Sequence, residues 1–131
     1  MQSIIIDAKP QPKERPRVIR GHAYTPTKTA QYEQRLAREW AAKYPDQAEG
    51  DLYVKMLFFM PIPTSWSRSK KELAERGMIR PSLRPDIDNL VKIVLEGLNG
   101  VAYLDDKQVV EIFASKAYSK EPRTEVVIEE I

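Results

Sequence analysis

The chain has 131 residues, of which 42% are hydrophobic and 31% are charged, so it is long enough to bury a core and has the size of one domain. It has no cysteine and a single histidine, His22, which excludes disulfides, thiolate zinc sites, a cysteine nucleophile and a multi-histidine metal centre. The longest apolar run is far too short to span a bilayer, and the amino terminus lacks a secretory signal pattern. We therefore expect a cytoplasmic protein with no membrane partner.

Charge is distributed unevenly along the chain, although the net charge is only +2. Residues 9–28 carry six basic side chains and one acidic one, and residues 64–84 carry six basic and two acidic. From Pro85 onward, ten acidic side chains outnumber five basic ones. This distribution suits a protein that holds a phosphate polymer with its two basic segments and cleaves it at the acidic cluster. Solvated loops and helix faces would explain either basic segment taken alone.

The first third of the chain predicts a strand, a long loop and a helix. The segment 3–8 is short and rich in β-branched residues, which is typical of a buried strand. Three prolines then favour an extended basic loop over residues 9–26, with an edge strand at 17–19. Thr25-Pro26-Thr27 resembles a helix entry, and apolar residues recur at helical spacing up to about Tyr44.

A central strand and a short basic helix are predicted next. Residues 52–60 are the strongest strand signal in the chain because they are apolar and end at prolines. Ser67 or Ser69 is a suitable N-cap for a helix over residues 70–76, which Gly77 ends.

The remaining elements are a second main helix and two strands. An apolar stripe runs through residues 87–98, and Asn99-Gly100 is a suitable helix end. Alternation at 108–118 and the segment 124–131 predict strands, joined by a turn at 120–123. This order predicts an α+β fold, in which a small mixed β-sheet packs with two main helices and one short basic helix in a single domain spanning the whole chain.

Acidic residues gather where the second main helix begins. Asp86 and Asp88 follow Pro85 and fall in the first helical turn, where helix capping would explain them as well as chemistry does. Asp88, Lys92 and Glu96 are spaced four residues apart and therefore share one helix face. Lys92 is either a phosphate contact or half of an ordinary salt bridge.

Asp105 and Asp106 form a second acidic pair beyond the helix. They join Asp86 and Asp88 only if residues 99–104 run back beside the helix, and a turn without a role is the alternative. Carboxylates close to an amide are the ligands that Mg²⁺ prefers. If they converge, their mutual repulsion destabilises the ion-free fold, so we expect Mg²⁺ to raise the melting temperature.

These motifs resemble those of the RusA-type Holliday junction resolvases. The resemblance is dense over residues 81–112 and weaker before them, where the loop ahead of Tyr24-Thr25-Pro26 and the segment 63–67 are also similar. The motifs that carry it are Pro85-Asp86-Ile87-Asp88-Asn89-Leu90 with Lys92, Leu95-Glu96-Gly97-Leu98-Asn99-Gly100, and Leu104-Asp105-Asp106-Lys107-Gln108-Val109.

The resemblance implies a homodimeric endonuclease, often carried by phages and prophages, that resolves four-way DNA junctions by paired symmetric nicks in recombination and repair. The implied cofactor is Mg²⁺, with Mn²⁺ as a substitute. Asp86, Asp88 and Asp106 would be the catalytic and metal-binding aspartates, and Lys92 the essential lysine. Asn89 and Asp105 would support them.

Basic residues outside the acidic cluster are candidates for DNA phosphate contacts. They are Lys13, Arg15, Arg17, Arg20, Arg68, Lys70, Lys71 and Arg76. Trp66 and Tyr24 are suited either to stacking on unpaired bases or to packing within the protein.

Other functions are compatible with the same residues. One is a metal-dependent flap or single-strand nuclease, and another is a non-catalytic DNA-binding module whose acids only cap helices. A divalent-ion-binding regulatory protein is a third, against which the two basic segments argue.

Overall fold

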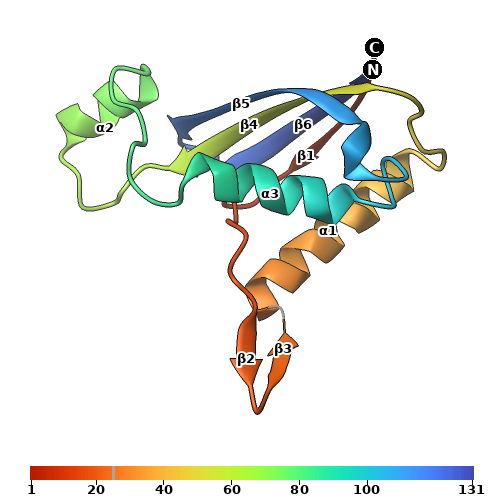
Figure 1. Ribbon diagram of the computed structural model, residues 1–131. Coiled ribbons are helices and arrows are strands. Elements are labelled where there is room, and N and C mark those ends of the chain that lie inside the picture. Colours follow the sequence, from red (N-terminus) through yellow and green to blue (C-terminus); the bar gives the residue numbers. More distant parts are fainter. Residues whose placement is uncertain (25) are drawn as a thin grey trace.

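The structure is a computed structural model that describes residues 1–24 and 26–131. Its main feature is a four-stranded mixed sheet, shown in Figure 1. The strands are β1 (Gln2–Ile6), β4 (Leu52–Pro61), β5 (Val109–Ser119) and β6 (Arg123–Glu130), in the spatial order β1-β6-β4-β5. β6 runs antiparallel to both β1 and β4, whereas β5 runs parallel to β4. The predicted α+β class and mixed sheet are confirmed.

One face of the sheet carries the core, because the strand side chains alternate between two environments. Along β4, every second side chain from Leu52 to Met60 is buried, and those between them are partly exposed. The helices α1 (Thr27–Lys43) and α3 (Ile87–Leu98) lie on the same side of the sheet (Figure 1). β4 is the predicted central strand.

The two long helices touch at a glycine. A side chain at Gly97 of α3 would place its Cβ 2.8 Å from Leu36 Cδ1 of α1, so any larger residue here would force the buried Leu36 to shift. Leu36 and Trp40 from α1, with Leu90, Ile93 and other residues of α3, are fully buried in the core. The close packing fixes the direction of α3 and hence the position of its two ends.

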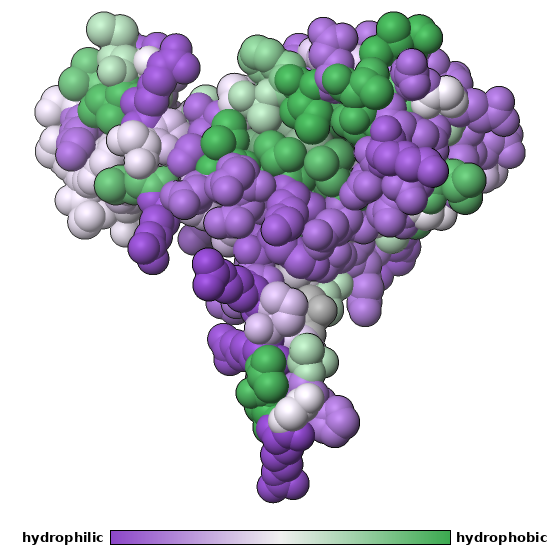
Figure 2. Space-filling model, in the orientation of Figure 1, coloured by the Kyte–Doolittle hydropathy of each residue, from purple (hydrophilic) through white to green (hydrophobic). Residues whose placement is uncertain are grey.

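A two-stranded hairpin leaves the body of the molecule between β1 and α1. It consists of β2 (Arg17–Ile19) and β3 (His22–Tyr24), and Figure 2 shows it as a narrow arm. The predicted strand at 17–19 is confirmed, but it pairs within this hairpin and not at the edge of the main sheet. The predicted helix entry at Thr25-Pro26-Thr27 falls partly outside the described residues, because Thr25 is not among them.

The short helix α2 (Arg68–Glu75) lies at one end of the sheet (Figure 1). Of its two predicted caps the structure selects Ser67, whose hydroxyl accepts a hydrogen bond from the Lys70 N–H at 3.3 Å. A single turn of 3-10 helix, η1 (Asp106–Gln108), precedes β5. Within the described part of the chain, no helix is long and apolar enough to cross a membrane.

Candidate functional site

The beginning of α3 presents two exposed aspartates. Asp86 occupies the N-cap position, but its side chain makes no capping hydrogen bond, and the helix hydrogen bonds begin at its backbone carbonyl. Asp88 lies in the first turn. A capping role requires a side-chain acceptor for the orphan N–H groups, so the structure gives no support to capping as the reason for Asp86.

Two contacts from distant segments hold this helix start in place. The Lys116 ammonium on β5 donates hydrogen bonds to the carbonyls of Leu83 at 3.1 Å and Pro85 at 2.9 Å. The backbone N–H of Lys13 donates to the carbonyl of Asn89 at 2.9 Å. The peptide that precedes Asp86 and the first turn of α3 are therefore fixed from both the sheet and the amino-terminal loop.

Lys92 lies one turn after Asp88 and is exposed. The neighbouring acid on the same helix face, Glu96, is paired instead with Lys13, whose Nζ lies 2.6 Å from Glu96 Oε2 and 2.9 Å from Glu33 Oε1. Burial alone would lower the pKa of Lys13, but the hydrogen bonds that its ammonium donates to Glu96 and Glu33, together with their negative charges, raise it. Within the described residues Lys92 forms no salt bridge with Asp88 or Glu96, so its ammonium is not committed to the helix.

The second acidic pair lies at the other end of α3. Residues 99–104 form a tight turn in which the Gly100 N–H donates to the Tyr103 carbonyl at 2.9 Å. The Tyr103 hydroxyl donates to the Leu95 carbonyl at 2.7 Å, and the Asp106 N–H donates to Asn99 Oδ1 at 3.0 Å. The run back along the helix that convergence requires is therefore not formed.

Asp105 and Asp106 differ in their surroundings. Asp105 caps η1 by accepting a hydrogen bond from the Lys107 N–H at 2.9 Å, and Gln108 completes the capping box. Although Asp106 is exposed, some desolvation raises its pKa, as do the hydrogen bond that its protonated carboxyl donates to the Asp105 side chain and the negative charges of Asp105 and Glu96. Asp105 thus has a structural role, whereas Asp106 lies in an acidic environment.

The predicted ligand set does not come together in one copy of the chain. The 12 residues of α3 rise about 1.5 Å each, which separates the two acidic pairs by roughly 18 Å along the helix. Across residues 1–24 and 26–131, no three side chains of the metal-binding acidic, histidine or cysteine types are grouped closely enough to hold an ion. Carboxylates are the ligands that Mg²⁺ prefers, but in one copy of the chain the described residues do not bring three of them together.

A groove rich in basic residues lies beside the helix start. It has a volume of about 600 Å³, and Asp86 and Asn89 form part of its wall. We call it the basic groove; its cationic residues are Lys9, Lys13, Lys28 and Arg84. Lys9, Lys28, Arg84 and Lys116 were not among the predicted site residues, although the first three belong to the basic segments of the sequence. Lys116 could have been noticed only from the strand pairing, which places this lysine opposite the buried Phe58, on the face of the sheet that packs against the core.

The predicted DNA contacts lie in three places. Arg15 is in the loop before the hairpin arm, and Arg17 and Arg20 are on the arm; all three are exposed. Lys13 lies between α1 and α3, and its ammonium is engaged by two carboxylates. The remaining candidates, Arg68, Lys70, Lys71 and Arg76, lie on or next to α2.

The two aromatic candidates also differ. The Trp66 ring packs edge-on against Tyr118 at a centroid distance of 5.3 Å, and Lys70 Nζ lies 4.1 Å from its centroid. Tyr24 is 41% exposed on β3. Packing within the protein therefore accounts for Trp66, while Tyr24 stays accessible on the arm.

A basic groove beside exposed carboxylates at a helix start is the arrangement expected of an enzyme that cleaves phosphodiesters. The chain belongs to the family described as Endodeoxyribonuclease RusA, whose sequence profile matches residues 7–129. It is also similar to the Uncharacterized protein YqaN of Bacillus subtilis (strain 168), with 41% identity over 113 residues that cover 84% of this chain and 80% of that protein. The predicted family is confirmed, and with it membership of a nuclease class that acts on DNA.

Proposed function

We propose that this protein is a Mg²⁺-dependent endodeoxyribonuclease that resolves four-way DNA junctions by paired symmetric nicks in recombination and repair. The observation that carries the proposal is the family match over residues 7–129, which spans the exposed acidic start of α3. Branched DNA is the proposed partner, and the cytoplasm the proposed location.

The residues of this chain divide the work between binding and cleavage. Lys9, Lys28 and Arg84 attract the DNA backbone into the basic groove, and Asp86 in the groove wall marks the position of the reacting phosphate. Lys92 offsets the negative charge that develops on that phosphate, and Asn89 orients a carboxylate or a water. Mg²⁺ or Mn²⁺ held by Asp86 and Asp88 would supply the activated water and contacts to the non-bridging oxygens.

We propose that the ligand set is completed in a homodimer. Asp106 lies at the opposite end of α3 from Asp86 and Asp88, so a second copy that presents its Asp106 end to the first copy's helix start would supply the missing carboxylate. A symmetric dimer would then contain two equivalent sites, which suits two symmetric nicks.

Mixing two inactive variants tests this arrangement. Asp88→Asn and Asp106→Asn each damage both sites of a homodimer, but a mixed dimer would keep one intact site because both substitutions fall in the other. We expect the mixture, refolded together, to regain nicking of a junction. If every mixture stays inactive although mixed dimers are detected by native mass spectrometry, each site belongs to a single chain.

The proposed activity is tested with a synthetic four-way junction, with Mg²⁺ and with chelator. Symmetric nicks that require the ion are expected, together with a melting temperature that rises with Mg²⁺ at millimolar concentrations. Absence of ion-dependent nicking, with the junction bound, would leave a non-catalytic DNA-binding module. Unchanged melting across the Mg²⁺ range would count against the metal site.

A substrate panel distinguishes the nuclease alternatives. Duplex, flap and single-stranded DNA of the same sequence are incubated beside the junction. A junction resolvase nicks the junction in strong preference, whereas a flap or single-strand nuclease favours the open substrates.

A further inference from the structure

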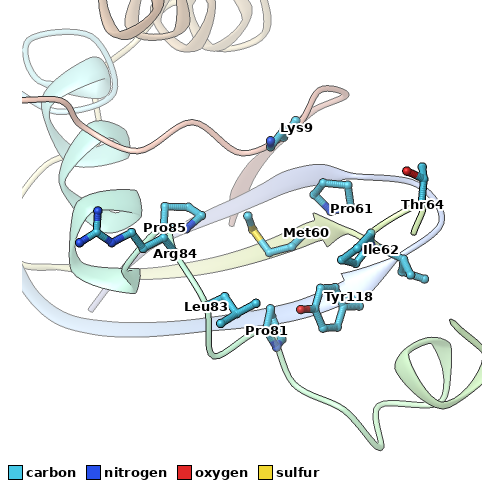
Figure 3. Close-up of a pocket in the computed structure, with 11 residues that line it drawn as sticks. Lys9, Met60, Pro61, Ile62, Thr64, Pro81, Leu83, Arg84, Pro85 and Tyr118 are labelled. Atoms are coloured by element: carbon cyan, nitrogen blue, oxygen red, sulfur yellow. The ribbon is translucent and has the colours of Figure 1, made fainter. Parts of the chain in front are cut away.

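A second cavity adjoins the basic groove, and it has a different chemical character. It has a volume of about 380 Å³ and is lined mainly by apolar side chains, as Figure 3 shows. We call it the proline pocket; its residues include Met60, Ile62, Leu83, Tyr118 and four prolines, Pro61, Pro63, Pro81 and Pro85. It shares Lys9, Arg84 and Pro85 with the basic groove, so these residues form a common rim.

We propose that the proline pocket receives one unstacked nucleobase of the bound DNA, while the phosphate next to that base lies in the basic groove beside Asp86. The inference rests on the proposed function and adds to it a site that would select the nucleotide at which cleavage occurs. A single nucleotide has both parts, because it is an apolar ring joined to an anion.

The shape and the walls of the pocket fit a flat ring. Its volume lies in the usual range of small-molecule sites, about 300–1,000 Å³. Proline has no backbone N–H, so four prolines form a surface that offers contact and few hydrogen bonds. Tyr118 supplies an aromatic ring, on which any base can stack, and its hydroxyl and that of Thr64 add two uncharged polar groups to the lining.

The pocket is formed before any DNA binds. Lys116 holds the wall that contains Leu83 and Pro85 by hydrogen bonds to both carbonyls, at 3.1 and 2.9 Å. Trp66, which is not among the lining residues, packs edge-on against Tyr118 at a centroid distance of 5.3 Å and so restrains its ring. A preformed pocket loses little conformational freedom when it is filled.

The common rim gives the pocket its preference for a nucleotide over an uncharged ring. Lys9 and Arg84 are exposed at this rim, and Asp86 is two residues beyond Arg84 in the wall of the basic groove. An anion is therefore attracted to the boundary between the two cavities. When a four-way junction is open, the bases at its branch point lack a stacking neighbour on one side, which lowers the cost of unstacking one of them.

A binding experiment with abasic nucleotides tests the inference. The Asp88→Asn protein, which is expected to bind without cutting, is titrated against junctions in which one base at a time near the branch point is removed. Loss of the base that occupies the pocket is expected to weaken binding about tenfold, at symmetry-related positions on opposing strands. A flat series, in which no removal weakens binding, would overturn the inference.

Substitution of a residue in the pocket wall provides a second test. Leu83 is 68% exposed in the pocket wall, so Leu83→Trp should cover the opening. Ile131→Trp is the matched control, because Ile131 is 72% exposed. Its backbone N–H is hydrogen-bonded to Asp51, which places it at the other end of β4. In the Asp88→Asn background, Leu83→Trp should weaken binding of the intact junction about tenfold. For the junction that lacks the base expected in the pocket, Leu83→Trp should cause no further loss of affinity. The control should bind like its parent and keep the abasic sensitivity.

The outcomes separate this inference from the proposed function. If base removal and Leu83→Trp each weaken binding and their effects on affinity multiply when combined, the base does not occupy the pocket. The inference then fails, while junction nicking by the wild type stands. If the wild type does not nick a junction with Mg²⁺, the proposed function fails, and the abasic series still reports whether a base is held. Thermal unfolding of both tryptophan variants shows whether the fold is retained.

Discussion

Both ends of α3 carry two aspartates, but the surrounding chain uses them differently. At the beginning, Asp86 holds the N-cap position without a capping hydrogen bond from its side chain and lines the basic groove. At the end, Asp105 caps η1, and the nearby charges of Asp105 and Glu96 help to raise the pKa of Asp106. The same residue type is thus committed to structure at one end and available at the other. Local hydrogen bonding makes the difference.

The largest expected effect tests the catalytic end. Lys92→Gln removes a cation that is not engaged by Asp88 or Glu96, so folding should be unaffected while nicking of a junction falls by about 100-fold. Single-turnover nicking at saturating protein measures this loss. Lys120→Gln is the control because Lys120 is exposed in the turn between β5 and β6, where it forms only a long ion pair with Glu75, at 3.6 Å. Equal activity of the two variants would remove Lys92 from the mechanism.

A smaller loss of activity is expected from a residue that positions this end. Lys116→Met deletes the hydrogen bonds to the Leu83 and Pro85 carbonyls, which leaves the peptide before Asp86 less well held. Nicking at saturating protein should fall by about tenfold, because a misplaced catalytic group affects the chemical step most. Junction affinity should also weaken, because the same hydrogen bonds hold the wall of the proline pocket. Lys55→Met on β4, on the sheet face away from the helices, should retain full activity.

The next prediction concerns stability at the far end. Lys13→Met leaves Glu33 and Glu96 without their cation and should lower the free energy of unfolding by about 1–2 kcal/mol. Since the pKa of Lys13 is raised in the folded protein, its contribution is complete below the ordinary value of 10.5 and is lost as the pH rises through the higher folded value. Urea unfolding at neutral pH measures the loss, and Lys13→Arg should restore most of it.

The smallest expected effects, on the free energy of unfolding, come from substitutions at the two N-cap positions, Asp105 and Asp86. Asp105→Ala removes a cap that is hydrogen-bonded and should cost about 1 kcal/mol, whereas Asp105→Asn keeps the acceptor and should cost little. Asp86→Ala removes no cap bond and should cost only the interaction with the helix dipole, about 0.5 kcal/mol. A larger loss from Asp86→Ala than from Asp105→Ala would reverse the comparison.

Local signals in the sequence were sufficient for most of the fold. The alternation and prolines of residues 52–61 specify β4, and the apolar stripe and Asn99-Gly100 specify the extent of α3. Ser67 was one of two possible caps because both serines precede the predicted helix over residues 70–76, whereas α2 begins at Arg68 and includes Ser69. These features depend on residues a few positions apart, which is the range over which propensity and capping act.

Contacts between distant segments were outside the reach of these signals. Whether residues 99–104 run back along α3 depends on a hydrogen bond from Tyr103 to Leu95 and on the close approach of Gly97 to Leu36. The pairing of Lys13 with Glu33 and Glu96 joins three segments that are far apart in the chain. Lys92 and the acids at the start of α3 were identified by spacing, whereas Lys116 required the strand pairing that places it beneath Pro85.

The central claim is that the exposed start of α3 cleaves junction DNA that other parts of the molecule bind. It is tested most directly by measuring junction binding and Mg²⁺-dependent nicking for Asp88→Asn and wild type in parallel. We expect equal affinity and loss of nicking in the variant, because Asp88 is exposed and its side chain forms no ion pair with the described part of the chain. Retained nicking, or loss of binding together with cleavage, would contradict it.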